Sequence, residues 1–471
     1  MIEDVLRKCD ELNEDAEARL RELLAIESVS TDPAYQPEIA RAADWVKRAL
    51  EQAGLEARIV SGEGHPVVLA HAPAERVANP HAPPVLFYGH YDVQPPDPME
   101  KWASPPFEPT IRESVDGPAV FARGACDDKG QVMCFLEALR AYREAGEKLP
   151  GPVTVLIEGE EECGSVGLAP MLERHKDELA AAACLVSDTS MWDAAASGGG
   201  PKPAICYGLR GLLYFDLQLH GPARDLHSGV YGGTIANPAT EIVRVLGNLF
   251  DENHRVAVPG FYDDVLDADE SEQARWDELG FDEQQYVESI GLKAPFGEAG
   301  RTTLERRWSR PSCDINGLYG GYMGEGGKTV IPTFAGIKVS FRLAAEQDAA
   351  KIAAAFREWI ESHDVGSLTW QITQHGQAHP VAVPTDSPQI RAVSAAVENE
   401  TGEPPAMVRE GATIPVVADF KTVLGLDTIL LGFGLNSDNI HSPDEHFALR
   451  RYHLGRRTYV RALAELGAAS M

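Results

Sequence analysis

The chain has 471 residues, which is too long for one hydrophobic core, and we expect two domains. Its formal net charge of −30 argues against nucleic acid and against an anionic membrane surface as partners, because both attract basic faces. The seven cysteines are scattered and odd in number, which is typical of a reducing compartment and predicts a cytoplasmic protein without a disulfide framework.

The first half of the chain alternates helix and strand patterns. Residues 1–20 have an acidic amphipathic helix pattern without the apolar core of a signal peptide. Apolar residues at helical spacing predict further helices over 39–53 and 131–145. Short apolar runs predict four strands, at 66–70, 84–88, 153–158 and 182–187. Strands that alternate with helices indicate an α/β sheet covered on both faces.

From about Gly208 the pattern changes to strands in which apolar and polar residues alternate, as in sheets with one open face. These strands are expected at 212–220 and 335–343, with helices at 237–250 and 348–362. An acidic, aromatic-bearing insert at about 260–310 has no clear pattern.

After Pro384 the α/β pattern resumes, with a strand predicted over 428–434 and a closing helix over 448–467. We therefore expect an α/β domain with a mixed, helix-covered sheet, formed by residues 1–207 and 381–471. An α+β domain of residues 208–380 is inserted into it.

Candidate metal ligands follow the predicted strands of the α/β domain. His90 and Asp92 follow one strand, and in an extended segment residues two apart point the same way.

Asp127 and Asp128 open a helix, three acids at 160–162 follow another strand, and Asp188 closes a third apolar run. His441 lies near the C-terminus. Each signal alone is weak, because adjacent acids also serve as capping charges and charge runs are usually solvated. Together they suit divalent metals.

Five motifs in this set resemble the M20 metallopeptidase family: HYDVQP (90–95), RGACDDKG (123–130), EEECGS (160–165), SDTS (187–190) and NIHSPDE (439–445). The resemblance extends over nearly the whole chain. Three further segments are similar to the branch of cytosolic nonspecific dipeptidases and carnosinases: 225–233, 308–332 and 409–416.

The resemblance implies a centre of two divalent metal ions, with zinc, manganese or cobalt as the candidates. Asp127 would bridge the two ions, His90 and Asp188 would complete one, and Glu162 and His441 would complete the other. Three carboxylates against two divalent cations leave one positive charge, which a bridging hydroxide would neutralise.

The resemblance also assigns the surrounding residues. Asp92 would orient His90, Glu161 would be the general base, and the Asp127–Asp128 peptide would be cis.

On the substrate side, the resemblance implies that Arg342 binds a C-terminal carboxylate and that Thr329, Gly411 and Thr413 line the pocket. His227 would stabilise the oxyanion from the partner subunit of a homodimer, and the inserted domain would be the lid and dimerisation domain. From the residues alone, Arg342 reads as an outward-facing charge on a strand and His227 as a loop histidine. The family often has Gly-Gly-Ser where this chain has Gly411-Ala412-Thr413, a change that a backbone contact would survive but that puts a contact by the serine hydroxyl in doubt.

Cys126 and Cys163 lie beside proposed site residues, and we interpret both as packing residues and not as nucleophiles.

The leading hypothesis is a metal-dependent dipeptidase. An N-acyl-amino-acid deacylase or carboxypeptidase of the same family is a second reading, which the dipeptidase-like segment 308–332 disfavours. A noncatalytic peptide-binding scaffold is a third, and loss of Glu161 or of a ligand would mark it, but none is lost. A serine hydrolase is disfavoured because no GxSxG motif lies at a strand-to-helix turn.

Overall fold

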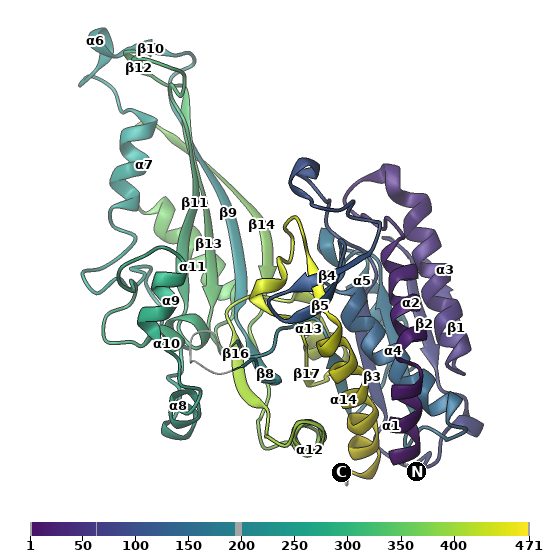
Figure 1. The fold of residues 1–471 in the computed structure, drawn as a ribbon. Coiled ribbons are helices and arrows are strands. Elements are labelled where there is room, and N and C mark those ends of the chain that lie inside the picture. Colours follow the sequence, from purple (N-terminus) through teal and green to yellow (C-terminus); the bar gives the residue numbers. More distant parts are fainter. Residues whose placement is uncertain (1, 63, 194–199, 470–471) are drawn as a thin grey trace. The chain divides into compact units, whose positions relative to one another are not determined.

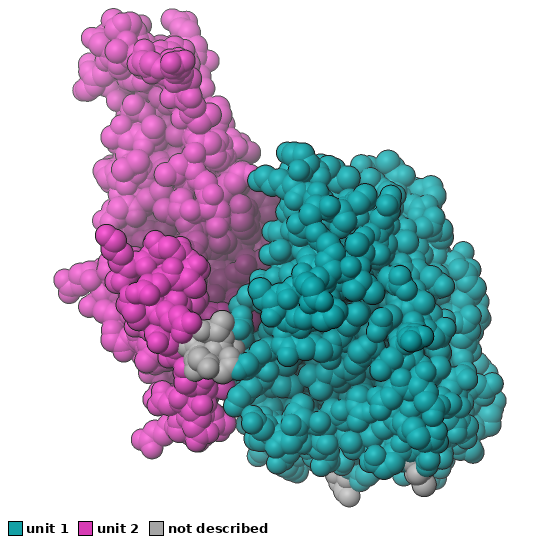
Figure 2. Space-filling view, in the orientation of Figure 1, with its two compact units in different colours: residues 1–207, 383–408, 415–471 teal, residues 208–382, 409–414 magenta. Residues whose placement is uncertain are grey.

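The structure is a computed structural model that describes residues 2–62, 64–193 and 200–469. The chain forms two compact units, which Figure 2 shows in different colours. Unit 1 comprises residues 1–207, 383–408 and 415–471, and unit 2 comprises residues 208–382 and 409–414. Over the described ranges, no helix combines the length and the apolar character that crossing a membrane requires.

Unit 1 is built on a mixed β-sheet whose central strands are parallel. Strand β3 (Val85–His90) lies between β6 (Val153–Glu158) and β7 (Ala183–Val186) and pairs in parallel with both, and β7 pairs in parallel with β17 (Thr428–Leu430). All residues of β3 and β7 are buried, as in strands covered by helices on both faces. The outer strands pair antiparallel: β1 (Glu56–Val60) and β2 (Val67–His71) beside β6, and β8 (Ala204–Leu209) beside β17. Strand β8 also pairs with β16 (Ala406–Glu410), and its last two residues, Gly208 and Leu209, pair with β15 (Val381–Ala382) within the bounds of unit 2.

Helices α4 (Lys129–Glu144) and α14 (Leu449–Ala468) are fixed to this sheet by aromatic packing. The ring of Phe87 on β3 stacks on Phe135 of α4, with the centroids 3.8 Å apart, and Tyr459 of α14 packs edge-on against both rings. Such pairs bury large apolar surfaces with a defined geometry. The N-terminus of α4, which follows Asp127, is therefore held against β3.

The remaining helices of unit 1 are α1 (Ile2–Glu11), α2 (Asn13–Leu24), α3 (Gln36–Gln52), α5 (Leu168–Arg174), α12 (Pro388–Thr401) and α13 (Pro415–Asp419). Four of them, α1, α2, α3 and α12, contact α4, α14 or the sheet, and α5 and α13 contact each other. Figure 1 shows α1, α2, α4 and α14 close together, and these helices contact one another. A small antiparallel sheet is formed by β4 (Thr110–Ser114), β5 (Gly117–Phe121) and β18 (His446–Ala448).

Unit 2 contains a four-stranded antiparallel sheet in the order β11-β13-β9-β14. The strands are β9 (Gly211–His220), β11 (Ser312–Gly320), β13 (Phe334–Leu343) and β14 (Thr369–Ala378). Along β9 the fully buried residues alternate with less buried ones, so one face of the sheet forms a core. Helices α7 (Pro238–Leu246) and α11 (Ala349–Glu361) pack on that core. A two-stranded ribbon joins β10 (Leu226–His227) to β12 (Val330–Ile331), and α6 (Ser228–Tyr231) follows β10.

The segment 260–310, which has no clear sequence pattern, folds within unit 2 around short helices. These are α8 (Glu270–Asp277), α9 (Glu283–Ser289) and α10 (Thr303–Trp308). The rings of Trp276 and Trp308 pack edge-on at 5.2 Å, and the buried guanidinium of Arg310 binds both carboxylate oxygens of Glu298, at 2.7 and 2.8 Å. Tertiary contacts of this kind stabilise the insert, which explains why its sequence shows no clear helix or strand periodicity.

The predicted α/β class with a mixed sheet and a second α+β unit is confirmed. The strand predicted over 153–158 coincides with β6, and the other predicted elements shift by a few residues at their ends. Three differ more. The N-terminal pattern forms two helices that separate at Leu12, α7 ends at Leu246, and β17 ends at Leu430 although a strand was expected to Gly434. Beyond this strand, the backbone at Gly432 passes so close to Thr189 that a Cβ atom added there would lie 1.9 Å from the Thr189 carbonyl oxygen. Only glycine fits at this position.

Candidate metal centre

Three parallel strands bring acidic and imidazole side chains to one edge of the unit 1 sheet. His90 is the last residue of β3 and lies opposite Glu158, the last residue of β6. Glu161 and Glu162 follow β6 within four residues, and Asp188 follows β7 by two. Because the carboxyl ends of parallel strands meet at the same edge, these side chains gather where open α/β sheets bind ligands.

Two other segments complete the cluster. Asp127 lies in the irregular segment between β5 and α4, and the Asp127–Asp128 peptide is cis, as expected. His441 lies in the loop between β17 and β18 and has a φ of +59°. The five candidate ligands thus come from five separate stretches of the chain: His90, Asp127, Glu162, Asp188 and His441.

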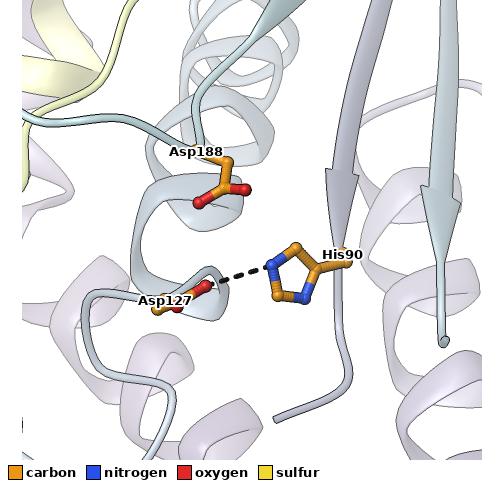
Figure 3. Close-up of side chains that lie close together, drawn as sticks. All are labelled: His90, Asp127 and Asp188. Atoms are coloured by element: carbon orange, nitrogen blue, oxygen red, sulfur yellow. Dashed lines mark hydrogen bonds and ion pairs between the residues drawn. The ribbon is translucent and has the colours of Figure 1, made fainter. Parts of the chain in front are cut away.

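The five side chains form two groups that share Asp127. His90, Asp127 and Asp188 form one group, whose side chains point toward one another in Figure 3, and Asp127, Glu162 and His441 form the other. Within each group the nearest ligand atoms all lie within 4.8 Å of one another. The two oxygens of Asp127 face different groups, since Oδ1 lies 3.1 Å from His90 Nε2 and Oδ2 lies 2.8 Å from His441 Nε2.

The electrostatics of the cluster favour added positive charge. Burial raises the pKa of Asp188 to about 7, and repulsion from Asp127 adds to this. Hydrogen bonds to Asp127 and Glu162 raise the pKa of His441 to about 10. Burial alone would raise the pKa of Asp127, but the imidazoles of His441 and His90 more than offset it and lower that pKa. These shifts reflect the close approach of imidazoles to carboxylates, and the nitrogen and oxygen donors of the cluster suit divalent cations, whose charge would offset that of the carboxylates.

Asp92 belongs to neither group but contacts residues of both. Its buried carboxylate lies 3.3 Å from His90 Nδ1. Its Oδ1 accepts the backbone N–H of Glu161 at 3.2 Å and its Oδ2 accepts that of Glu162 at 3.0 Å. One carboxylate therefore fixes the His90 ring and the turn that carries both glutamates.

Gln94 is a site residue that the sequence analysis missed. Its Nε2 donates to Glu162 Oε2 at 2.8 Å and to the Glu162 carbonyl at 3.2 Å, so it orients this carboxylate. The spacing of two residues that relates His90 to Asp92 also relates Asp92 to Gln94, and this alternation was the available signal.

Glu161 belongs to neither of the groups found within the described part of the chain, although it adjoins Glu162. Burial raises the pKa of its carboxyl well above the usual value, and the charges of Asp188 and Glu162 raise it further. A carboxyl with a raised pKa beside two groups of candidate metal ligands is suited to proton transfer.

In unit 2, His227 and Thr329 lie together on the β10–β12 ribbon, and both are exposed. The backbone N–H of Ser228 donates to the Thr329 carbonyl at 3.1 Å. The Nδ1 of His227 accepts the backbone N–H of Gly229 at 3.0 Å. A nitrogen that accepts a hydrogen bond carries no proton, so the proton of the neutral ring is on Nε2.

Arg342, Gly411 and Thr413 form a second group in unit 2. The guanidinium of Arg342 on β13 donates to Thr413 Oγ1 at 2.8 Å, and this hydroxyl donates to the Arg210 carbonyl at 2.6 Å. Arg210, which the sequence analysis did not single out, also binds the Gly411 carbonyl through Nε at 3.0 Å. The side chain of Arg342 lies on the face of β13 opposite the core residues Phe341 and Leu343, where it is half-buried, and burial lowers its pKa.

Neither cysteine next to the cluster has the environment of a nucleophile. Burial raises the pKa of Cys126 well above its usual value, and desolvation raises that of Cys163 to about 11. Thiols in such surroundings remain protonated at neutral pH.

Comparison with known proteins agrees with this architecture. The chain matches the profile of peptidase family M20/M25/M40 over residues 86–465. It is 30% identical to the Beta-Ala-His dipeptidase of Homo sapiens, over 99% of this chain and 93% of that one, and 29% identical to the Cys-Gly metallodipeptidase dug1 of Schizosaccharomyces pombe, over 97% of both. The structure of the M20 family metallo-carboxypeptidase Sso-CP2 from Sulfolobus solfataricus superposes with a TM-score of 0.83 at 29% identity, over 96% of this chain and 99% of that one. Since the profile spans most of the chain, the protein belongs to peptidase family M20/M25/M40.

Proposed function

We propose that the protein is a dipeptidase that depends on two divalent cations per subunit, with zinc, manganese or cobalt as the candidates. The observation that carries the proposal is the pair of three-residue groups that share Asp127. The two dipeptidases to which the chain is similar act, by name, on dipeptides with different side chains, which supports a dipeptide as the substrate class.

In this proposal His90 and Asp188 bind one cation, Glu162 and His441 bind the other, and Asp127 binds both. Two bound cations polarise the scissile carbonyl and lower the pKa of water. The protein contributes the orientation of its ligands, since Asp92 fixes His90 and Gln94 fixes Glu162 through the hydrogen bonds given above.

Glu161 acts as the general base. Its carboxylate takes a proton from the attacking water and gives it to the nitrogen of the leaving amine, so that the amine departs neutral. Two features support this role: its place beside a group of ligands without being a member, and its raised pKa.

The substrate residues lie in unit 2. The Arg342 guanidinium, oriented by Thr413, binds the C-terminal carboxylate of the dipeptide, and Gly411, Thr413 and Thr329 line the pocket. His227 donates a hydrogen bond from its Nε2–H to the developing oxyanion. The tautomer with the proton on Nε2 supports this role.

We also infer that the protein is a cytoplasmic homodimer, in which unit 1 is the catalytic domain and unit 2 is the lid and dimerisation domain. Several large apolar side chains of unit 2 are exposed near His227, among them Val230 at 67% and Tyr231 at 39%, and a second subunit would cover such a surface. The seven cysteines are scattered along the chain and odd in number, which supports a reducing compartment.

A carboxypeptidase is the second candidate, since the structure superposes on a metallo-carboxypeptidase of the family. The two activities separate with blocked substrates. A dipeptidase cleaves a free dipeptide far faster than its N-acetylated form, whereas a carboxypeptidase or deacylase accepts the blocked N-terminus.

We expect a chelator to abolish dipeptide hydrolysis and zinc, manganese or cobalt ions to restore it. The reason is that, in the proposed mechanism, the cations polarise the carbonyl and lower the pKa of the attacking water, and the five ligand side chains cannot do this without them. The measurement is turnover of a dipeptide panel alongside elemental analysis of the same samples. Full activity in protein shown to be metal-free would reject the proposed function.

We expect Arg342→Ala to lower kcat/KM for free dipeptides by about 10- to 100-fold, since a charge-assisted bond to the carboxylate is lost. C-terminally amidated dipeptides, which lack that carboxylate, should show little further loss. The ratio of kcat/KM for free and amidated substrates measures the effect. An equal loss for both substrates would exclude Arg342 as the carboxylate ligand.

A further inference from the structure

Glu445 is a fully buried carboxylate that lies one residue before β18. Its Oε1 accepts the backbone N–H groups of Cys126 and Asp127, at 2.9 and 3.1 Å. Its Oε2 accepts the backbone N–H of Gly124 at 3.0 Å and Nη1 of Arg123 at 2.7 Å. Four donors thus converge on one carboxylate, and three of them are backbone groups of the segment that carries Asp127.

This segment has no regular secondary structure to fix its backbone. Residues 122–128 form turns and bends between β5 and α4. Buried N–H groups outside helices and strands need other acceptors, and here one side chain supplies them for Gly124, Cys126 and Asp127. The backbone of Asp127 is therefore placed by Glu445, while its side chain faces both candidate metal groups.

The same residue ends the loop that carries His441. Asn439, His441 and Asp444 have φ values of +58°, +59° and +60°, in the left-handed region that asparagine, histidine and aspartate adopt more often than other non-glycine residues. The loop is anchored at one end by the buried Asp438, which pairs with Arg451, and at the other end by Glu445. Glu445 thus links the segment of Asp127 to the loop of His441.

We propose that Glu445 is a positioning residue of the metal centre, which holds the Asp127 backbone so that one carboxylate oxygen of Asp127 faces His90 and the other faces His441, as a residue that would bind both cations requires. This inference rests on the proposed two-cation function. Glu445 bonds to no ligand side chain and acts through three backbone N–H groups, so it affects cation affinity first and turnover only as a consequence.

A purely structural role is the alternative, and the chain offers a matched control for it. Glu137 on α4 is also fully buried and also binds guanidinium groups, of Arg19 at 2.7 Å and of Arg140 at 2.8 Å. It makes none of the hydrogen bonds that hold the 122–128 segment. Both Glu445→Gln and Glu137→Gln remove one buried charge with an arginine partner, but only the first disturbs the backbone of Asp127.

The experiment titrates metal-free wild type, Glu445→Gln and Glu137→Gln with zinc ions by calorimetry, and measures dipeptide turnover and thermal unfolding of the same samples. In Glu445→Gln the amide group presents a donor to other donors. We expect its zinc affinity to fall by about 10- to 100-fold, as for outer-sphere partners of metal ligands, and kcat to approach the wild-type value at saturating zinc. Glu137→Gln should unfold at a lower temperature but keep the wild-type affinity.

If Glu445→Gln does not fold, Glu445→Asp replaces it, since aspartate keeps the charge but withdraws the oxygens from the backbone donors. Wild-type zinc affinity in the variant would overturn the positioning role and leave the proposed function intact. Equal losses of affinity in the Glu445 and Glu137 variants would also overturn it, because the effect would then be one of stability. A wild-type protein that binds no zinc, manganese or cobalt would overturn the proposed function itself.

Discussion

Replacement of Glu161 by Gln is expected to lower kcat by about 10²-fold or more while both cations stay bound. The amide has nearly the same size as the carboxylate but cannot accept the proton of the attacking water. Glu161 belongs to neither candidate group, so the substitution removes no proposed ligand. The backbone N–H of Glu161 still donates to Asp92, which keeps the turn in place. Single-turnover kinetics with elemental analysis of the same protein measure both quantities.

Glu162→Gln is the matched control for this experiment. It changes the adjacent carboxylate in the same way, but Glu162 lies in a candidate group with Asp127 and His441. We expect this variant to lose part of its bound metal along with its activity. Near-normal turnover of Glu161→Gln with two cations bound would assign the general base to another residue.

The proximity of His90, Glu162 and Asp188 could be predicted because each follows a predicted buried strand, whereas the inclusion of Asp127 and His441 as ligands came from the family resemblance. The strands β3 and β7 are buried on both faces and β6 nearly so, and all three therefore appear as largely apolar runs. The polar residues that end these runs must lie at one edge if the strands are parallel. A sequence of strands alternating with helices predicts parallel strands.

The supporting hydrogen bonds could not be predicted in the same way. Glu445 contacts a segment more than 300 positions away in the chain, since its partner Cys126 is 319 residues distant. Nothing in the local pattern distinguishes such an acid from a solvated one. The sequence pattern does not predict the fold of the insert at 260–310 for the same reason, because its structure depends on contacts between residues far apart, such as Arg310 with Glu298 and Trp276 with Trp308.

His227→Ala is also expected to be nearly inactive, and a mixing experiment tests in which subunit it acts. His227 lies in unit 2 and its Nε2 is available as a donor, while the candidate ligands and Glu161 lie in unit 1. If His227 stabilises the oxyanion in the partner subunit, Glu161 and His227 of one complete site come from different chains. A heterodimer of His227→Ala with Glu161→Gln then has one site with both defects and one site with neither.

Mixing the two inactive variants should therefore restore about half of the wild-type activity per mixed dimer, since each site is completed independently. Differently tagged chains, purified as heterodimers, give that value directly. As the control, Glu161→Gln mixed with Glu162→Gln should recover nothing, because both residues lie in the unit 1 site of their own chain and every site keeps one defect. Absence of recovery in the first mixture, with subunit exchange demonstrated, would mean that His227 does not act across the dimer. In that case each heterodimer site has one defect, whichever chain supplies the metal ligands.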